Sequence, residues 1–278
     1  MKKNTTLLLF LLATTFSWAQ KDEKIKGSKI VTIEQKEIGN FHSIEVGDNI
    51  EVSLEKGDKT ELKIEADDNL HNIITLDLVD NILRLNTSKT VVNFKKLLLR
   101  VTYTKDLKMV VSKNESTVNA IQEIQLEDIT FKSFNNSKLN LNVNSKNFIL
   151  QSDDKSKTEL NLKAESATIE LSKNANLKAL IASVDLKCDL YQKAKANLEG
   201  DVTNAIIRLD NNANFIGSKL ILKNAELVAE GYSNCSINSS SAMSIDASGN
   251  SEIQIYGDQK IELRRFVDSA TLVKKPTK

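Results

Sequence analysis

Residues 137–155 read SKLNLNVNSKNFILQSDDK, and residues 156–174 read SKTELNLKAESATIELSKN. The two stretches have equal length and the same alternation of apolar and polar side chains. The repeat then continues, because its small first residue recurs every nineteen positions, at Ser137, Ser156, Ala175, Ala194 and Ala213. Repeats of constant length that alternate with period two are typical of stacked β-strand coils, so the sequence predicts an all-β fold, a parallel β-solenoid.

The alternation gives each strand an inner and an outer side, because successive side chains of a strand point to opposite faces. We expect the apolar positions to fill the lumen of the solenoid. In the first half of the coils they are Leu139, Leu141, Val143, Thr158, Leu160, Leu162, Leu177, Ala179 and Ile181. In the second half they are Phe148, Leu150, Ala167, Ile169, Leu171, Leu186, Cys188, Leu190, Ala205, Ile207 and Leu209.

Polar corners separate these strands. Asn144-Ser145-Lys146 divides the two halves of one coil, and Asp153-Asp154-Lys155 closes it. Asn and Asp accept left-handed backbone conformations, so such corners turn sharply without glycine.

One coil is a residue longer than its neighbours and the next is shorter. The inner positions therefore move to Ala225, Leu227 and Ala229, and then back to Met243, Ile245 and Ala247. A register error would turn every side chain over, so this compensated shift supports the assignment.

The outer positions supply a candidate binding face, which consists of Asn140, Asn142, Gln151, Glu159, Asn161, Glu170, Asp189, Asn197 and Arg208. Side chains at fixed spacing on a flat wall suit a polymer or protein partner. A filled lumen leaves no concave pocket for a small molecule.

Residues 41–111 also alternate, but without a constant repeat. Turns at Lys56-Gly57-Asp58 and Asp80-Asn81 carry residues typical of hairpins. This half either continues the solenoid or forms a separate antiparallel cap, and the alternation alone fits both.

The amino terminus has the features of a secretory signal at residues 1–19. Lys2-Lys3 is followed by the apolar run Leu7–Ala13 and by a small-x-small cleavage site at Ser17-Trp18-Ala19. The run is shorter than the roughly 20 residues that span a bilayer. We therefore expect an exported protein, in the periplasm, on the cell surface or secreted, with no membrane span after signal removal.

The remaining boundaries follow from the repeat. Residues 20–40 are a lead-in, and residues 41–263 are one solenoid domain, with the irregular half at 41–111 and regular coils at 112–263. Residues 264–278 form a basic tail. The net charge is +1 with the signs interspersed, so no basic stripe suggests nucleic acid as a partner.

The residue types that carry catalysis are scarce. The two histidines, His42 and His71, lie in the irregular half, and we expect surface or turn positions for both. Cys188 and Cys235 fall on inner positions about three coils apart, too far for a disulfide, so buried free thiols are expected. Glu65, Asp67 and Asp68 fit a solvated turn better than a calcium site. We predict no catalytic residue, no metal and no cofactor.

Phe41-His42-Ser43-Ile44-Glu45-Val46, followed by Ile50-Glu51-Val52-Ser53-Leu54 and Gly57-Asp58, resembles the opening of the putative auto-transporter adhesin head GIN domain family. The resemblance covers roughly residues 41–263. It implies a right-handed parallel β-helix in an envelope or secreted protein of Gram-negative bacteria, and it brings no catalytic residues with it. The coils here use Asn, Ala and Lys where glycine-rich members have Gly-Ser-Gly.

The sequence favours a non-enzymatic, adhesin-like binding protein, with a polysaccharide or an envelope protein as partner. One alternative is a carbohydrate-active enzyme, a polysaccharide lyase or hydrolase, on the same scaffold. An outer groove that gathers two carboxylates, or a carboxylate with an arginine, would favour that enzyme. The other alternative is a structural module that assembles end to end, and the oligomeric state is left open.

Overall fold

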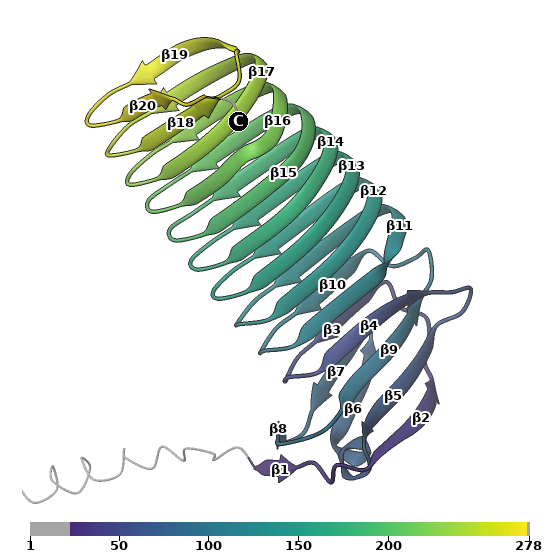
Figure 1. The fold of residues 1–278 in the computed structure, drawn as a ribbon. Helices are drawn as coiled ribbons and strands as arrows, with labels where there is room; N and C mark the ends of the chain where they lie inside the picture. Colours follow the sequence, from purple (N-terminus) through teal and green to yellow (C-terminus); the bar gives the residue numbers. More distant parts are fainter. Residues whose placement is uncertain (1–22, 277–278) are drawn as a thin grey trace, which may run out of the picture.

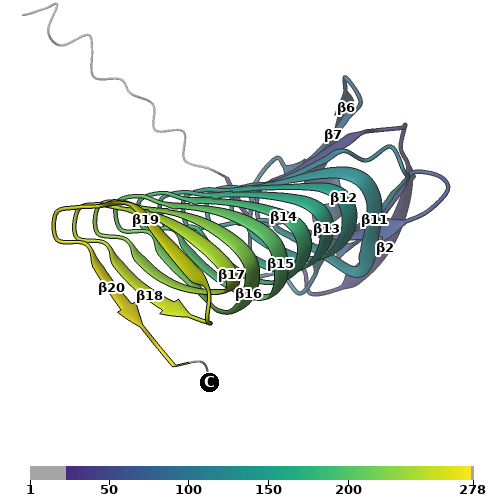
Figure 2. The same cartoon turned by 90° about the horizontal axis from the view of Figure 1, so that it is seen from above.

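The computed structural model describes residues 23–276 and confirms the β-solenoid. Within that range about nine coils stack into a rod, which Figure 1 shows from the side. Seen from above, each coil is flat and narrow (Figure 2). The predicted signal at residues 1–19 lies outside the described residues.

Each regular coil is one long strand with a bend near its middle. These strands are β11 (Thr117–Ser133), β12 (Lys138–Ser152), β13 (Lys157–Leu171), β14 (Asn176–Leu190), β15 (Lys195–Leu209), β16 (Asn214–Ala229) and β17 (Asn234–Ala247). Each pairs in parallel with the next. The pairing of β12 with β13 omits Lys146, so the predicted corner at 144–146 is a bend within a strand.

The lumen contains every residue predicted to lie there, and none of them is more than 8% exposed. Leu141, Leu160, Ala179 and Leu198 stand directly above one another in adjacent strands. Burying one leucine side chain stabilises a fold by roughly 1.5–3 kcal/mol, so these columns hold the rod together.

The sharp corner of each coil explains the small residue that opens each repeat. Ser137 donates its N–H to the carbonyl of Phe134 at 3.1 Å, and Ala175 does the same to Ser172 at 3.1 Å. All five small residues of the repeat are completely buried beneath their turns. A larger side chain there would press on the neighbouring coil.

The register shift predicted between coils is present. The pairing of β15 with β16 shifts between Asn197 and Glu199, and that of β16 with β17 contains two shifts whose net effect reverses it. Ala225 and Met243 still face inward in neighbouring strands.

The irregular half combines both alternatives that the sequence left open. β3 (Ser43–Val46) and β4 (Glu51–Lys56) form a coil, and β7 (Ile82–Thr87) and β9 (Leu97–Tyr103) form another. The first of these coils lies between the second and the coil of β10 (Met109–Ser112) and β11. The order of coils in the rod therefore differs from their order in the sequence.

Antiparallel strands close this end of the rod. β5 (Glu61–Asp67) pairs with β9, β2 (Val31–Glu37) pairs with β5, and β6 (Ile74–Val79) pairs with β7. A short 3-10 helix, η1 (Asp68–Ile73), links β5 to β6, and β1 (Lys24–Lys26) pairs with β8 (Thr90–Val92). The hairpin at Asp80-Asn81 is confirmed. The one at 56–58 is wrong, because β9 lies between β4 and β5.

Strands extend past both predicted boundaries of the domain. β1 and β2 belong to the segment expected as a lead-in. At the other end, β18 (Glu252–Tyr256) is followed by β19 (Lys260–Phe266) and β20 (Thr271–Lys274), which pair with β17 and β18. Much of the predicted basic tail is thus the last coil of the rod.

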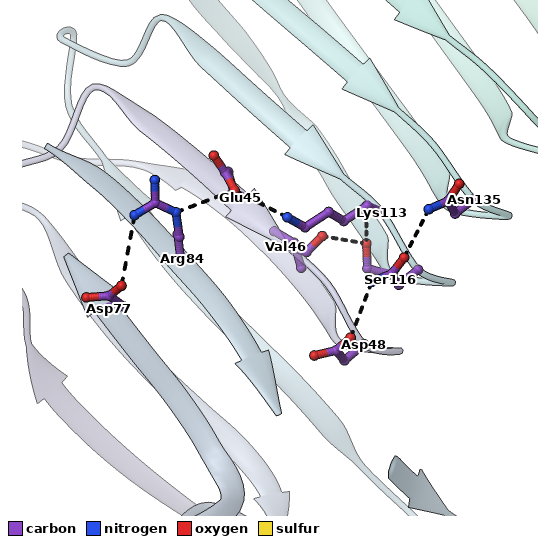
Figure 3. A network of polar contacts seen from close by, with 9 residues as sticks. Glu45, Val46, Asp48, Asp77, Arg84, Lys113, Ser116 and Asn135 are labelled. Atoms are coloured by element: carbon purple, nitrogen blue, oxygen red, sulfur yellow. Dashed lines mark hydrogen bonds and ion pairs between the residues drawn. The ribbon is translucent and has the colours of Figure 1, made fainter. Parts of the chain in front are cut away.

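A chain of charges crosses the region where the coil order changes (Figure 3). Arg84 of β7 lies 3.9 Å from Asp77 of β6 and 3.6 Å from Glu45 of β3. Lys113, just after β10, reaches the same Glu45 at 3.4 Å. These contacts join the β6–β7 hairpin to β3 and to the segment after β10, three parts of the chain that are distant in the sequence.

Candidate binding grooves

The nine residues of the predicted face fall on two separate walls of the rod. Asn140, Glu159 and Asn197 share one column of paired residues with Lys178, and Asn142 and Asn161 begin the next column. Gln151, Glu170, Asp189 and Arg208 form a column on the strand halves beyond the bend. The columns were correctly predicted from the sequence, but the prediction assigned residues of two different walls to a single face.

One of the nine is not an open surface residue. Asp189 is only 9% exposed, and the Lys187 ammonium lies 3.2 Å from its carboxylate. The expectation that Asp189 is available to a partner is therefore wrong.

The wall that carries Asn140 and Asn142 has a shallow groove of about 600 Å³ that crosses β11 to β15. We call it the axial groove. Its polar lining consists of Asn140, Asn142, Glu159, Asn161, Lys178, Asn197 and Glu199. Five of the nine predicted residues therefore come together here. A groove of this size was not expected from a filled lumen.

Asparagine amides are hydrogen-bonded between the coils along this groove. Asn140 donates to the side-chain oxygen of Asn119 at 2.7 Å, and Asn161 donates to that of Asn142 at 3.1 Å. A carboxamide has two N–H donors and two acceptor lone pairs. Each of these amide–amide hydrogen bonds between coils, here called ladder bonds, uses one N–H donor of one amide and one lone pair of the other. The remaining N–H groups and lone pairs can bind a ligand.

Apolar side chains complete the groove. Ala120, Leu141, Leu160 and Ala179 also line it, while Leu180 and Ile121 are 55% and 83% exposed. Leu180 stands between Asn161 and Glu199 in its column. An apolar residue at an outward position is visible in the sequence, and Leu180 could have been included in the predicted binding face on that ground.

A second groove, of about 630 Å³, lies on the wall beyond the bend near the C-terminal end. We call it the C-terminal groove. Asn204, Ile206, Asn224, Glu226, Glu262 and Arg264 are among its lining residues. Arg264 forms an ion pair with Glu226 at 3.4 Å. This groove therefore gathers two carboxylates and an arginine, the combination that would favour a carbohydrate-active enzyme.

No group of His, Cys, Asp and Glu side chains suited to a metal ion occurs within residues 23–276. Cys188 and Cys235 are free and buried, as predicted, and burial raises the pKa of both thiols. His42 is exposed as expected. His71 is not, because its side chain is 10% exposed and its ring lies between Thr32 and Glu34.

Asp67 contradicts the prediction of a solvated turn. It is completely buried at the end of β5, and its carboxylate accepts backbone N–H groups from Lys29, Lys95 and Lys96 at 2.9 to 3.1 Å. Burial raises the pKa of this carboxyl, but these N–H donors outweigh that effect and hold the pKa below its ordinary value. Asp67 thus joins three segments of the closed end.

The chain matches a family model described as putative auto-transporter adhesin, head GIN domain, over residues 40–180 and 157–258. The chain belongs to this family. No curated protein matches this GIN-domain chain. Within the part that the structure describes, no helix is long and apolar enough to cross a membrane.

Solved structures with the same fold cover nearly the whole GIN-domain chain. A putative adhesin from Parabacteroides merdae ATCC 43184 is 17% identical, with a TM-score of 0.62 over 92% of this chain and 98% of its own. A putative adhesin from Parabacteroides distasonis ATCC 8503 is 15% identical, with a TM-score of 0.63 over 91% and 98%.

A third structure, named a putative lipid binding protein and also from Parabacteroides distasonis ATCC 8503, is 14% identical, with a TM-score of 0.62 over 91% and 100%. At these identities the likeness to all three structures shows the fold alone.

Proposed function

We propose that the chain is an exported, non-enzymatic binding protein of the cell envelope whose axial groove holds an extended polysaccharide. The family description as an adhesin head supports a binding role and an exported location. The observation that carries the proposal is the meeting of five outward polar residues with exposed Leu180 in one groove along the rod.

The dimensions and chemistry of the groove suit a polymer. Strands stack about 4.8 Å apart, so the four steps from β11 to β15 span roughly 19 Å, the length of a few sugar units. Sugar hydroxyls both donate and accept hydrogen bonds, as the amides of the groove do. Leu180 and Ile121 offer apolar surface to the C–H faces of sugar rings.

Binding to a glycan array, compared between two matched variants, tests this function. Asn161→Ala removes a ladder amide inside the groove, and we expect about 3- to 10-fold weaker binding, the effect of one lost hydrogen bond. Asn147→Ala is the control, because the Asn147 amide also donates a hydrogen bond to the neighbouring coil, to the carboxylate of Asp128 at 2.7 Å, but on the other wall. Equal effects of both variants, or no glycan bound by the wild type, would contradict the proposal.

The C-terminal groove keeps an enzyme as the second candidate. Glu226 and Glu262 occupy one column with Ser244 between them, so their backbones lie about 9.6 Å apart, near the upper limit of carboxylate separation in inverting glycosidases. An assay of reducing-sugar release on the bound glycans decides between the two. Turnover that disappears in Glu226→Gln or Glu262→Gln would support the enzyme, and binding without turnover supports the binding protein.

A further inference from the structure

A third cavity, of about 640 Å³, lies at the sharp-corner edge of the rod and shares no lining residue with the two grooves. Three stacked turns form one side, and Thr87–Val91 with Glu23 form the other. We call it the turn-edge cup. Its volume is in the range of pockets that bind small ligands, roughly 300–1,000 Å³.

The three turns come from coils that are adjacent in the rod but not in the sequence. Each turn has two successive residues in the left-handed conformation: Asp48 and Asn49, Asn114 and Glu115, Asn135 and Asn136. The amide of Asn135 donates to Asn114 at 3.1 Å, and that of Asn114 donates to Asp48 at 3.5 Å, as Figure 3 shows in part. The first residues of the turns are thus bound to one another.

The second residues, Asn49, Glu115 and Asn136, are exposed on the cup. Their side chains form no hydrogen bond or ion pair with any other residue in the range 23–276. Backbone hydrogen bonds between coils hold two of the three in place, since the N–H of Asn49 donates to the carbonyl of Asn114 at 3.1 Å and that of Glu115 donates to the carbonyl of Asn135 at 3.0 Å. The result is a row of amide, carboxylate and amide at the strand spacing of about 4.8 Å.

The charges around this row limit what it can bind. On the opposite wall the Lys89 ammonium is held by Glu23 at 2.7 Å, so that cation is already neutralised. The carboxylate of Asp48 accepts the N–H of Thr87 at 3.2 Å in addition to the Asn114 amide. One unengaged carboxylate between two carboxamides is too little charge for a metal site, but it suits a ligand rich in hydroxyl groups.

We propose that the turn-edge cup binds a sugar residue, with Glu115 accepting hydrogen bonds from two hydroxyls while Asn49 and Asn136 bind those on either side. The site is separate from the axial groove. Asn161→Ala should therefore leave it unchanged, and the two proposals can fail independently.

Isothermal titration of the full chain with glucose, galactose, mannose and N-acetylglucosamine tests the proposal. We expect saturable binding of at least one of these sugars. Glu115→Asn should weaken it 10- to 100-fold, because hydrogen bonds to a charged group are lost. Asparagine accepts the left-handed conformation, so the unfolding temperature of this variant should not fall.

Asn136→Ala should weaken binding about 3- to 10-fold. Asn81→Ala is the matched control, because Asn81 is likewise the exposed second residue of two successive left-handed residues, in a hairpin outside the cup. The proposal is overturned if none of the four sugars binds, if Glu115→Asn binds as well as the wild type, if Asn81→Ala weakens binding as much as Asn136→Ala, or if calcium chloride alone gives the saturable signal.

Discussion

Gly200 stands at a position in the rod where no side chain fits. It pairs with Ile181 below and Leu220 above, and its φ of +115° lies in a region that residues with a Cβ rarely adopt. A Cβ there would collide with the carbonyl oxygen of Ile181. We expect Gly200→Ala to lower the free energy of unfolding by on the order of 3 kcal/mol, measured by urea denaturation. Asp201→Ala, at the exposed neighbour, should change it by less than about 0.5 kcal/mol.

Asp67 makes stability depend on pH. Because its pKa is lower in the folded chain than in the unfolded chain, its carboxylate stabilises the fold fully above the unfolded pKa of about 4. That contribution disappears as the pH falls through the folded pKa. Asp67→Asn should cost on the order of 3 kcal/mol at pH 7, because backbone hydrogen bonds to a buried charged group are weakened or lost, and should lose less further stability than the wild type between pH 5 and pH 3. A parallel pH profile for the two proteins would contradict this role.

Single residues were predictable from the sequence where their environment repeats every nineteen positions. The lumen residues, the buried cysteines and the columns through Asn140 and Asn142 follow from that spacing. Asp67 was not predictable, because its donors at Lys29 and Lys95 are brought to it by strand pairings that no local pattern reveals. Asp189 was wrongly included in the binding face, because an outward direction does not guarantee exposure.

At the scale of elements, the last coil combines open edges with features that discourage strand addition. Ile261 and Leu263 are 42% and 49% exposed, whereas Met243 and Ile245 below them are at most 2% exposed. However, β19 bulges near Arg264, and Lys274 of β20 takes the inward position above Ile255. Bulges and inward-pointing charges protect edges from pairing with other chains.

These features predict that the wild type stays monomeric at high concentration. Lys274→Ile, which replaces the inward-pointing charge with an apolar side chain, should produce association that grows with concentration, seen by light scattering after size exclusion. Lys195→Ile, which adds one exposed isoleucine on the side of the rod, should not. Association of the wild type would instead favour the end-to-end assembly module.

Elements were predictable where pairing joins neighbours in the sequence, as in β11 to β17. The irregular half was not, because alternation identifies a strand without identifying its partners. β3 pairs with strands that begin at Ile82 and Met109, both distant in the sequence. The axial groove needed the correct register and the division of the outer surface into two walls, and only the register was present in the repeat.

At the scale of the whole molecule, the rod has one end closed by antiparallel strands and one end that is open. Coils interact mainly with their neighbours, so partial unfolding should begin at the open end. Cys235 lies three coils nearer to that end than Cys188. We expect a thiol reagent in mild denaturant to label Cys235 first, measured by mass spectrometry of peptides. Burial raises the pKa of both thiols, so neither should react in the native state. Equal labelling rates would indicate that the rod unfolds as one unit.

The coil of β3 and β4 has a consequence for how the chain acquires its structure. Its two neighbours are built from residues 82–103 and 109–120, which are made after it. A chain that emerges amino terminus first, from a ribosome or a translocation pore, must therefore hold this segment unpaired until β7 has appeared, some thirty residues after Lys56, and can pair its second side only some sixty residues after Lys56. Productive maturation then depends on delayed closure of the first coil, and a pause in synthesis within residues 57–108 would leave two strands open to wrong partners.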